Sequence, residues 1–147
     1  TDEEVTAGLT RHAEILAGIA AHSDARTVDV RKSGEAWLQL ATRHARSDQW
    51  VTSFAAAERS VQLLASIVAT PERQPTDELN LAEAELLAIS IRMKDGVETS
   101  VKRLRQVELR LQNLKVTAAD SNAEVLSRAS SLLQKCSRLI AAASSAN

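Results

Sequence analysis

Apolar side chains recur at alternating spacings of three and four residues through most of this 147-residue chain. The clearest run in the N-terminal half is formed by Trp50, Phe54, Ala57, Val61, Leu64 and Val68. This spacing matches the 3.6-residue turn of an α-helix and places the apolar side chains on one face. The chain also has only four glycines, two prolines, two tryptophans and one phenylalanine, so it lacks the residues that strands and tight turns use. We therefore predict an all-α fold.

The first helix is predicted over residues 2–22. Thr1 and Glu4 have the spacing of a capping box, in which each side chain accepts a hydrogen bond from the other residue's backbone N–H. The apolar stripe that follows, which we expect to face a neighbouring helix, consists of Val5, Leu9, His12, Leu16 and Ile19.

Two further helices are predicted before the first proline. The second helix carries Trp37 and ends near Arg46, but its start is left open because Val28 and Val30 could extend it toward the N-terminus. Aspartate is favoured at helix N-caps, so we expect Asp48 to cap the third helix.

The one clear linker is the segment 70–76, which lies around Pro71 and Pro75. A proline inside a helix removes a backbone hydrogen bond and clashes with the preceding turn. We therefore predict a single domain over residues 1–147 in which this linker joins two helical hairpin units.

The apolar spacing resumes after the linker and continues over residues 76–115. The tripeptide Lys94-Asp95-Gly96 interrupts it, and a glycine there is typical of a helix end. Two possibilities stay open, which are a break at this tripeptide and one continuous helix with a stutter. A last helix is expected after the capping-box pair Ser121 and Glu124, which gives about five to six helices.

The chain also matches itself at an offset of 47 residues, which for example pairs Leu40 with Leu87 and Ala41 with Ala88. In the first copy the recurring positions are Trp37, Leu40, Ala41, His44, Trp50, Ser53, Ala57 and Ser60. In the second copy they are Ala84, Leu87, Ala88, Ile91, Val97, Ser100, Leu104 and Val107. The small residues among them would let paired helices approach closely.

Over residues 34–112 this pattern resembles the tetratricopeptide repeat, although alanine replaces the family's glycine, its closing proline is absent and its usual period is 34 residues. The resemblance implies antiparallel helical hairpins in a stack; without it, the same stripes would form a helical bundle. It also implies a partner-binding groove, whose positions correspond to Glu35, Thr42, Arg46, Glu85 and Arg92.

The sequence offers no constellation of catalytic or metal-binding residues. His12 and His44 lie on apolar stripes, and Cys136 lies between Leu132 and Ile140, where a thiol packs as a small hydrophobic side chain. There is no HExxH or CxxC pattern and no glycine-rich phosphate loop. We expect no enzymatic activity, no cofactor and no bound metal.

Charge narrows the classes of partner. A net charge of −1 with charges of both signs interspersed argues against nucleic-acid and membrane-surface binding. The lone cysteine and the absence of a long apolar run favour a cytoplasmic location. The densest cluster of one sign, which is a solvated face or a docking site for an acidic segment, consists of Lys102, Arg103, Arg105 and Arg110.

Two functions are consistent with these observations. The first is a non-enzymatic protein–protein interaction module or scaffold that binds a peptide or helix of a larger assembly. The alternative is a structural coiled-coil or bundle segment that forms a homodimer or docks on a cytoskeletal polymer through its basic helix face.

Overall fold

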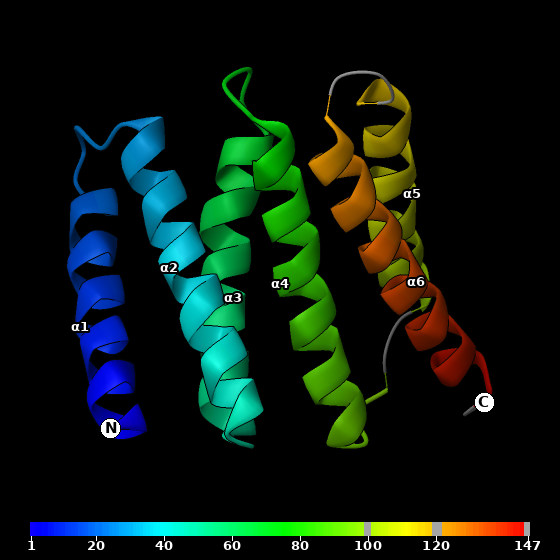
Figure 1. Cartoon of the computed structure of the whole chain (residues 1–147), viewed down its shortest axis with the longest axis horizontal. Helices are drawn as coiled ribbons and strands as arrows, with labels where there is room; N and C mark the ends of the chain where they lie inside the picture. The colour runs from blue at the N-terminus through cyan, green and yellow to red at the C-terminus, as the bar shows by residue number, and fades with distance from the viewer. Residues whose placement is uncertain (99–100, 119–121, 146–147) are drawn as a thin grey trace. The chain divides into compact units, whose positions relative to one another are not determined.

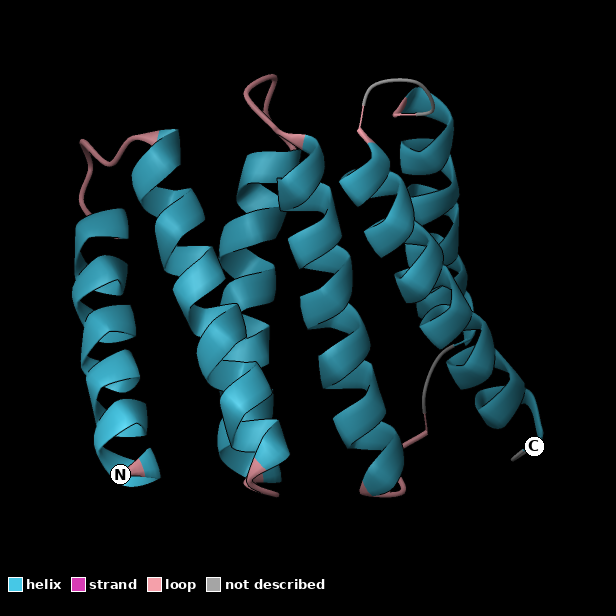
Figure 2. Ribbon diagram, viewed as in Figure 1, coloured by secondary structure: helices cyan, strands magenta, loops and turns pink. Residues whose placement is uncertain are grey.

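The computed structural model describes residues 1–98, 101–118 and 122–145, and every regular element in these ranges is an α-helix (Figures 1 and 2). This confirms the all-α prediction. The helices are α1 (Asp2–Ala20), α2 (Thr27–Arg46), α3 (Trp50–Val68), α4 (Pro75–Lys94), α5 (Val101–Thr117) and α6 (Ala123–Ser145). They divide into two compact units, Thr1–Arg73 and Gln74–Asn147. The boundary lies inside the linker predicted at 70–76, and the single-domain organisation of 1–147 stays a prediction.

The N-terminal ends of α1 and α2 follow local sequence signals. The Glu4 backbone N–H donates to Thr1 Oγ1 at 3.2 Å, as the predicted capping box requires. Helix α2 begins at Thr27, so Val28 and Val30 do extend it toward the N-terminus. The Asp29 carboxylate accepts a hydrogen bond from the Arg26 backbone N–H at 3.1 Å and so satisfies one of the free donors at the start of the helix.

The prediction that Asp48 caps α3 is wrong. Gln49 occupies the N-cap position, and Asp48 has a φ of +56°. The turn between α2 and α3 is so short that one residue must take the left-handed conformation, which aspartate tolerates better than most residues. The Gln49 backbone N–H closes this turn by donating to the His44 carbonyl oxygen at 2.9 Å.

Small residues bring α2 and α3 close together. Ser53 Oγ donates to the Ala41 carbonyl oxygen at 2.7 Å, and Ser60 Oγ donates to the Gly34 carbonyl oxygen at 2.8 Å. All four residues are buried, and the close approach predicted at Ala41 and Ser53 is confirmed. Such packing is not specific to one family, so the tetratricopeptide resemblance stays a prediction.

The predicted stripe of α1 is only partly packed: Leu9 and Leu16 are half-buried, but the other three members are exposed. Val5 and Ile19 are 50% and 47% exposed, and His12 is exposed as well. The packed side includes Thr6, whose Oγ1 accepts a hydrogen bond from Arg43 Nε at 2.7 Å. Ala13, also on this side, is completely buried. The threonine and alanine side chains allow a closer contact than the valine and isoleucine stripe would.

In the second unit, the segment 76–115 forms two helices and not one. Helix α4 ends at Lys94 and α5 begins at Val101, so the continuous-helix alternative is wrong. Gly96 takes a left-handed conformation with φ of +73°, and the Val97 backbone N–H donates to the Arg92 carbonyl oxygen at 3.0 Å. This closes the C-terminal turn of α4 in the way that glycine-terminated helices do. Ser100, which the repeat pattern includes, lies outside the described residues.

Helices α4, α5 and α6 enclose one apolar core. Its fully buried side chains are Leu79, Ala82, Leu86, Leu104, Leu111, Ala129 and Cys136. Helix α4 starts with Pro75, which has no N–H to leave unsatisfied at that position. Ser121, the predicted start of the last capping box, is outside the described residues; Asn122 Oδ1 accepts from the backbone N–H groups of Glu124 and Val125.

Candidate partner-binding site

The residues predicted to line a partner-binding groove fall into both units. Glu35, Thr42 and Arg46 lie on α2, whereas Glu85 and Arg92 lie on α4. The Thr42 hydroxyl donates to the Leu38 carbonyl oxygen of its own helix at 2.9 Å. Glu85 accepts a hydrogen bond from Arg110 and is half-buried. The structure therefore brings Glu85 and Arg110 together, but it does not gather the five predicted positions within one unit.

The predicted basic cluster on α5 is not one free surface. Arg110 Nη1 lies 2.6 Å from Glu85 Oε2, and these side chains are only 28% and 13% exposed. Arg105 Nη1 lies 2.8 Å from Glu108 Oε2, one turn along α5. Arg103 is half-buried and Lys102 is exposed. A fully solvated face, one of the two possibilities for this cluster, therefore does not apply to Arg110, because α4 supplies a carboxylate beside it.

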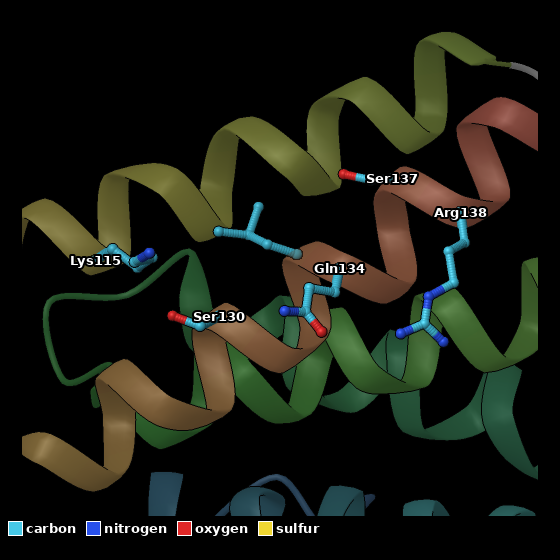
Figure 3. A pocket seen from close by; sticks show the side chains of 6 residues that line it. Lys115, Ser130, Gln134, Ser137 and Arg138 are labelled. Carbon is cyan, nitrogen blue, oxygen red and sulfur yellow. The ribbon is translucent and has the colours of Figure 1, made fainter.

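A surface hollow with a volume of about 480 Å³ lies instead between α5 and α6 (Figure 3). Its lining consists of Lys115 from α5 and of Ser130, Leu133, Gln134, Ser137 and Arg138 from α6. We call this depression the α5–α6 hollow.

The packing of α6 explains why these side chains gather there. Helix α6 buries one stripe that runs from Val125 to Ala143 and includes Cys136. Because neighbouring residues of a helix are about 100° apart, Leu133 and Ser137 follow at the edge of that stripe and Gln134 lies further round. Leu133 is half-buried, whereas Gln134 and Ser137 are exposed. The lining is therefore apolar at its base and polar at its rim.

Neither cation of the hollow has an acidic partner among residues 1–98, 101–118 and 122–145. Neither Lys115 nor Arg138 forms an ion pair or hydrogen bond with any residue that the structure describes. By contrast, Arg128 on α6 forms an ion pair with Glu83 of α4, in which Nη2 and Oε2 are 2.7 Å apart. Residues 101–145 contain eight basic and only three acidic residues, so the α5–α6 hairpin is positively charged. The α5–α6 hollow thus offers an anionic group two cations, two hydroxyls and an amide.

Residue spacing alone indicates this site only weakly. Lys115 directly follows the buried Leu114, and Arg138 lies two residues after the buried Cys136. Both positions are therefore typical of basic side chains on the solvent-facing side of an ordinary helix. Their shared hollow depends on how α5 packs against α6, which residue spacing within one helix does not reveal.

The histidine and cysteine side chains considered as reactive groups in the sequence do not line the α5–α6 hollow. His12 is exposed on α1, whereas His44 is buried on α2 with its Nδ1 at hydrogen-bond distance from Gln49 Oε1. Cys136 is buried and its Sγ lies 3.3 Å from the Leu104 carbonyl oxygen. Burial raises the pKa of this thiol, and the negative charge of Glu108 adds to the effect. Among residues 1–98, 101–118 and 122–145, no three His, Cys, Asp or Glu side chains are grouped as metal ligands.

None of the helices, as far as the structure describes them, is long and apolar enough to cross a membrane. Comparison of the chain with protein-family models, with curated proteins and with solved structures found no match.

Proposed function

We propose that this chain is a non-enzymatic protein–protein interaction module that docks an acidic segment of its partner on the α5–α6 hollow. The observation that carries the proposal is the position of Lys115 and Arg138, two cations without a carboxylate partner in the described chain, around one depression. This assignment replaces the cluster around Arg105 and Arg110, whose charges are already paired within the unit.

The physical chemistry of the hollow suits recognition rather than catalysis. The lining offers hydrogen-bond donors and apolar surface, and none of its six residues is a carboxylate, a histidine or a thiol that could exchange protons near neutral pH. Charges at a partly exposed surface contribute mainly to the association rate and to selectivity between partners. Binding should therefore be reversible and sensitive to salt.

Charge reversal in the full-length chain tests this proposal. Lys115→Glu combined with Arg138→Glu should weaken binding of a fluorescently labelled poly-glutamate peptide by at least about tenfold, measured by fluorescence anisotropy. Circular dichroism should show unchanged helix content, because both side chains lie outside the apolar core.

The matched control is Lys135→Glu. Lys135 is on the same helix and has no partner among the described residues, but it does not line the hollow. Equal loss of binding in the control and in the double variant would contradict the proposal, as would binding that is unaffected by raising the salt concentration above physiological ionic strength.

The exposed apolar residues of α1 favour a second candidate function, the self-association of two copies. Val5, Gly8, His12, Ile15 and Ile19 follow the alternating spacing of three and four that is typical of a helix–helix seam. Val5 and Ile19 are about half exposed, and Ile15 is 57% exposed.

Sedimentation equilibrium over a range of protein concentrations tests this second candidate. Combining Ile15→Lys with Ile19→Lys should shift a dimer to monomer, whereas Val51→Lys, at an exposed position on α3, should not. A wild-type chain that is monomeric at every concentration would exclude it.

A further inference from the structure

The α5–α6 hollow is elongated along α6. Figure 3 shows Lys115 and Ser130 at one end, Gln134 between, and Ser137 and Arg138 at the other end. Ser130 and Arg138 are eight residues apart on α6, which corresponds to about 12 Å at 1.5 Å per residue. The hollow thus has one cation and one serine toward each end.

We infer that the acidic segment is an amphipathic α-helix whose two acidic side chains are seven residues apart, with an apolar residue between them. This inference rests on the proposed function. Positions i and i+7 of a helix lie on the same face and about 10.5 Å apart, close to the roughly 12 Å along α6 between Ser130, which lies at the Lys115 end of the hollow, and Arg138. The flexible lysine and arginine side chains accommodate the remaining difference.

Leu133 indicates that the partner helix carries an apolar residue between its two acidic residues. It is half-buried and is the only aliphatic side chain among the lining residues that the structure describes. On α6 it lies three residues after Ser130 and five before Arg138, near the middle of the hollow. In a helix laid along α6, positions i+3 and i+4 would meet Leu133, so we expect a leucine or similar residue there.

A helix fits this surface better than an extended peptide does. The backbone of an extended peptide carries N–H and C=O groups that need partners, which a sheet edge normally supplies. The lining residues of the hollow all belong to α5 and α6, whose backbone groups are engaged along the helices. A helical partner satisfies its own backbone and presents only side chains to Lys115, Leu133 and Arg138.

Three labelled synthetic peptides of equal charge test the inference on the full-length chain. The first has Glu at i and i+7 with Leu at i+3 and i+4 in an Ala/Gln background. The second has the same composition and the same leucines but Glu at i and i+5, which lie on different faces of a helix, and the third is the first with proline replacing the alanine or glutamine at i+5. We expect the first to bind about five- to tenfold more tightly than the other two in fluorescence anisotropy.

A charge swap locates the binding. The peptide with Lys at i and i+7 should not bind the wild-type chain, and it should bind the chain carrying Lys115→Glu and Arg138→Glu. The Lys135→Glu control should keep the wild-type preference for the glutamate peptide.

The outcomes separate the two levels of the proposal. If all three acidic peptides bind equally and lose binding in the double variant, the helical spacing is wrong and the proposed function stands. If the proline peptide binds best, the partner is extended. If no acidic peptide binds, or if binding ignores the double variant, the proposed function itself is overturned.

Discussion

The contact between α2 and α3 and the core of the second unit use small side chains to different extents, although both also bury large aliphatic residues such as Leu40, Leu64 and Leu104. Between α2 and α3 the buried hydroxyls of Ser53 and Ser60 bond directly to the backbone carbonyl oxygens of Ala41 and Gly34. The second core is filled by leucine, valine, isoleucine and alanine side chains from three helices. Its charged contacts, such as the one from Arg110 to Glu85, are only partly buried.

This difference teaches that two helical units of one chain can be sensitive to opposite changes in volume. A contact made by small residues is disrupted by added atoms, because the side chains of the facing helix leave no room. A core made of large aliphatic residues is disrupted by removed atoms, because a cavity remains. The predictions below test this contrast in order of decreasing expected effect.

The largest effect is expected from Leu104→Ala in the second core. Leu104 is fully buried, so its truncation should lower the free energy of unfolding by about 2 to 5 kcal/mol, measured by urea denaturation. Leu109→Ala, on the same helix but 57% exposed, is the control and should cost under about 1 kcal/mol. Similar costs for the two variants would show that the burial pattern of α5 is wrong.

Gly34→Ala tests the opposite sensitivity in the first unit. A Cβ at this position would lie 2.8 Å from Leu64 Cγ and Cδ2, and Leu64 is itself completely buried. We expect the added methyl group to cost about 1 to 3 kcal/mol. At Gly8 a Cβ would meet nothing within 4 Å, so Gly8→Ala should stabilise the chain by about 0.5 to 1 kcal/mol. If Gly34→Ala stabilises the chain as well, the close approach of α2 and α3 is not real.

Ser53→Ala isolates one buried hydroxyl between α2 and α3. It removes the 2.7 Å hydrogen bond to Ala41 without adding volume, and we expect a cost of about 0.5 to 1.5 kcal/mol. Ser66→Ala removes an exposed hydroxyl bonded to Leu63 of the same helix, and it should leave the denaturation midpoint nearly unchanged. A cost at Ser53 no greater than at Ser66 would argue against a packing role for this hydroxyl.

The smallest effect concerns the pH dependence of the second core. Burial raises the pKa of the Cys136 thiol above its usual range, so the folded state favours the protonated form. The corresponding stability is fully present below the pKa of the unfolded thiol and is lost as the pH rises through the higher pKa of the folded state. Between pH 7.5 and pH 10 the wild-type chain should therefore lose more stability than Cys136→Ala. Parallel losses in urea denaturation would show that the thiol does not contribute.

The helical fold could be predicted because helices begin and end at residues that can be recognised within a few positions of the sequence. The capping pair Thr1 and Glu4 and the glycine at position 96 both act within a few residues, and each lies at a helix end in the structure. The side of α1 that packs on α2 could not be predicted in this way. Both the side of α1 with small residues around Ala13 and the side with larger residues around Val5 could pack on another helix. Which side is buried depends on the side chains that α2 presents.

The candidate site could not be predicted from the sequence, because it too depends on contacts between different helices. Counting charges along α5 singles out Arg105 and Arg110, which have the densest spacing. Their value for binding depends on Glu108 and Glu85, and Glu85 is 25 residues away on another helix. Lys115 and Arg138, which have no partner among the described residues, line one hollow only when α5 and α6 pack together.

The short turn between α2 and α3 also determines where the chain can be labelled or extended. The backbone N–H groups of Ser47, Asp48 and Gln49 all donate to carbonyl oxygens of the last turn of α2, so the connection contains no spare length. An inserted residue here would rotate α3 by about 100° and draw Ser53 away from the Ala41 carbonyl oxygen. The connection between α1 and α2, over residues 21–26, has more exposed positions and is the better place to insert a fluorescent tag or a protease site.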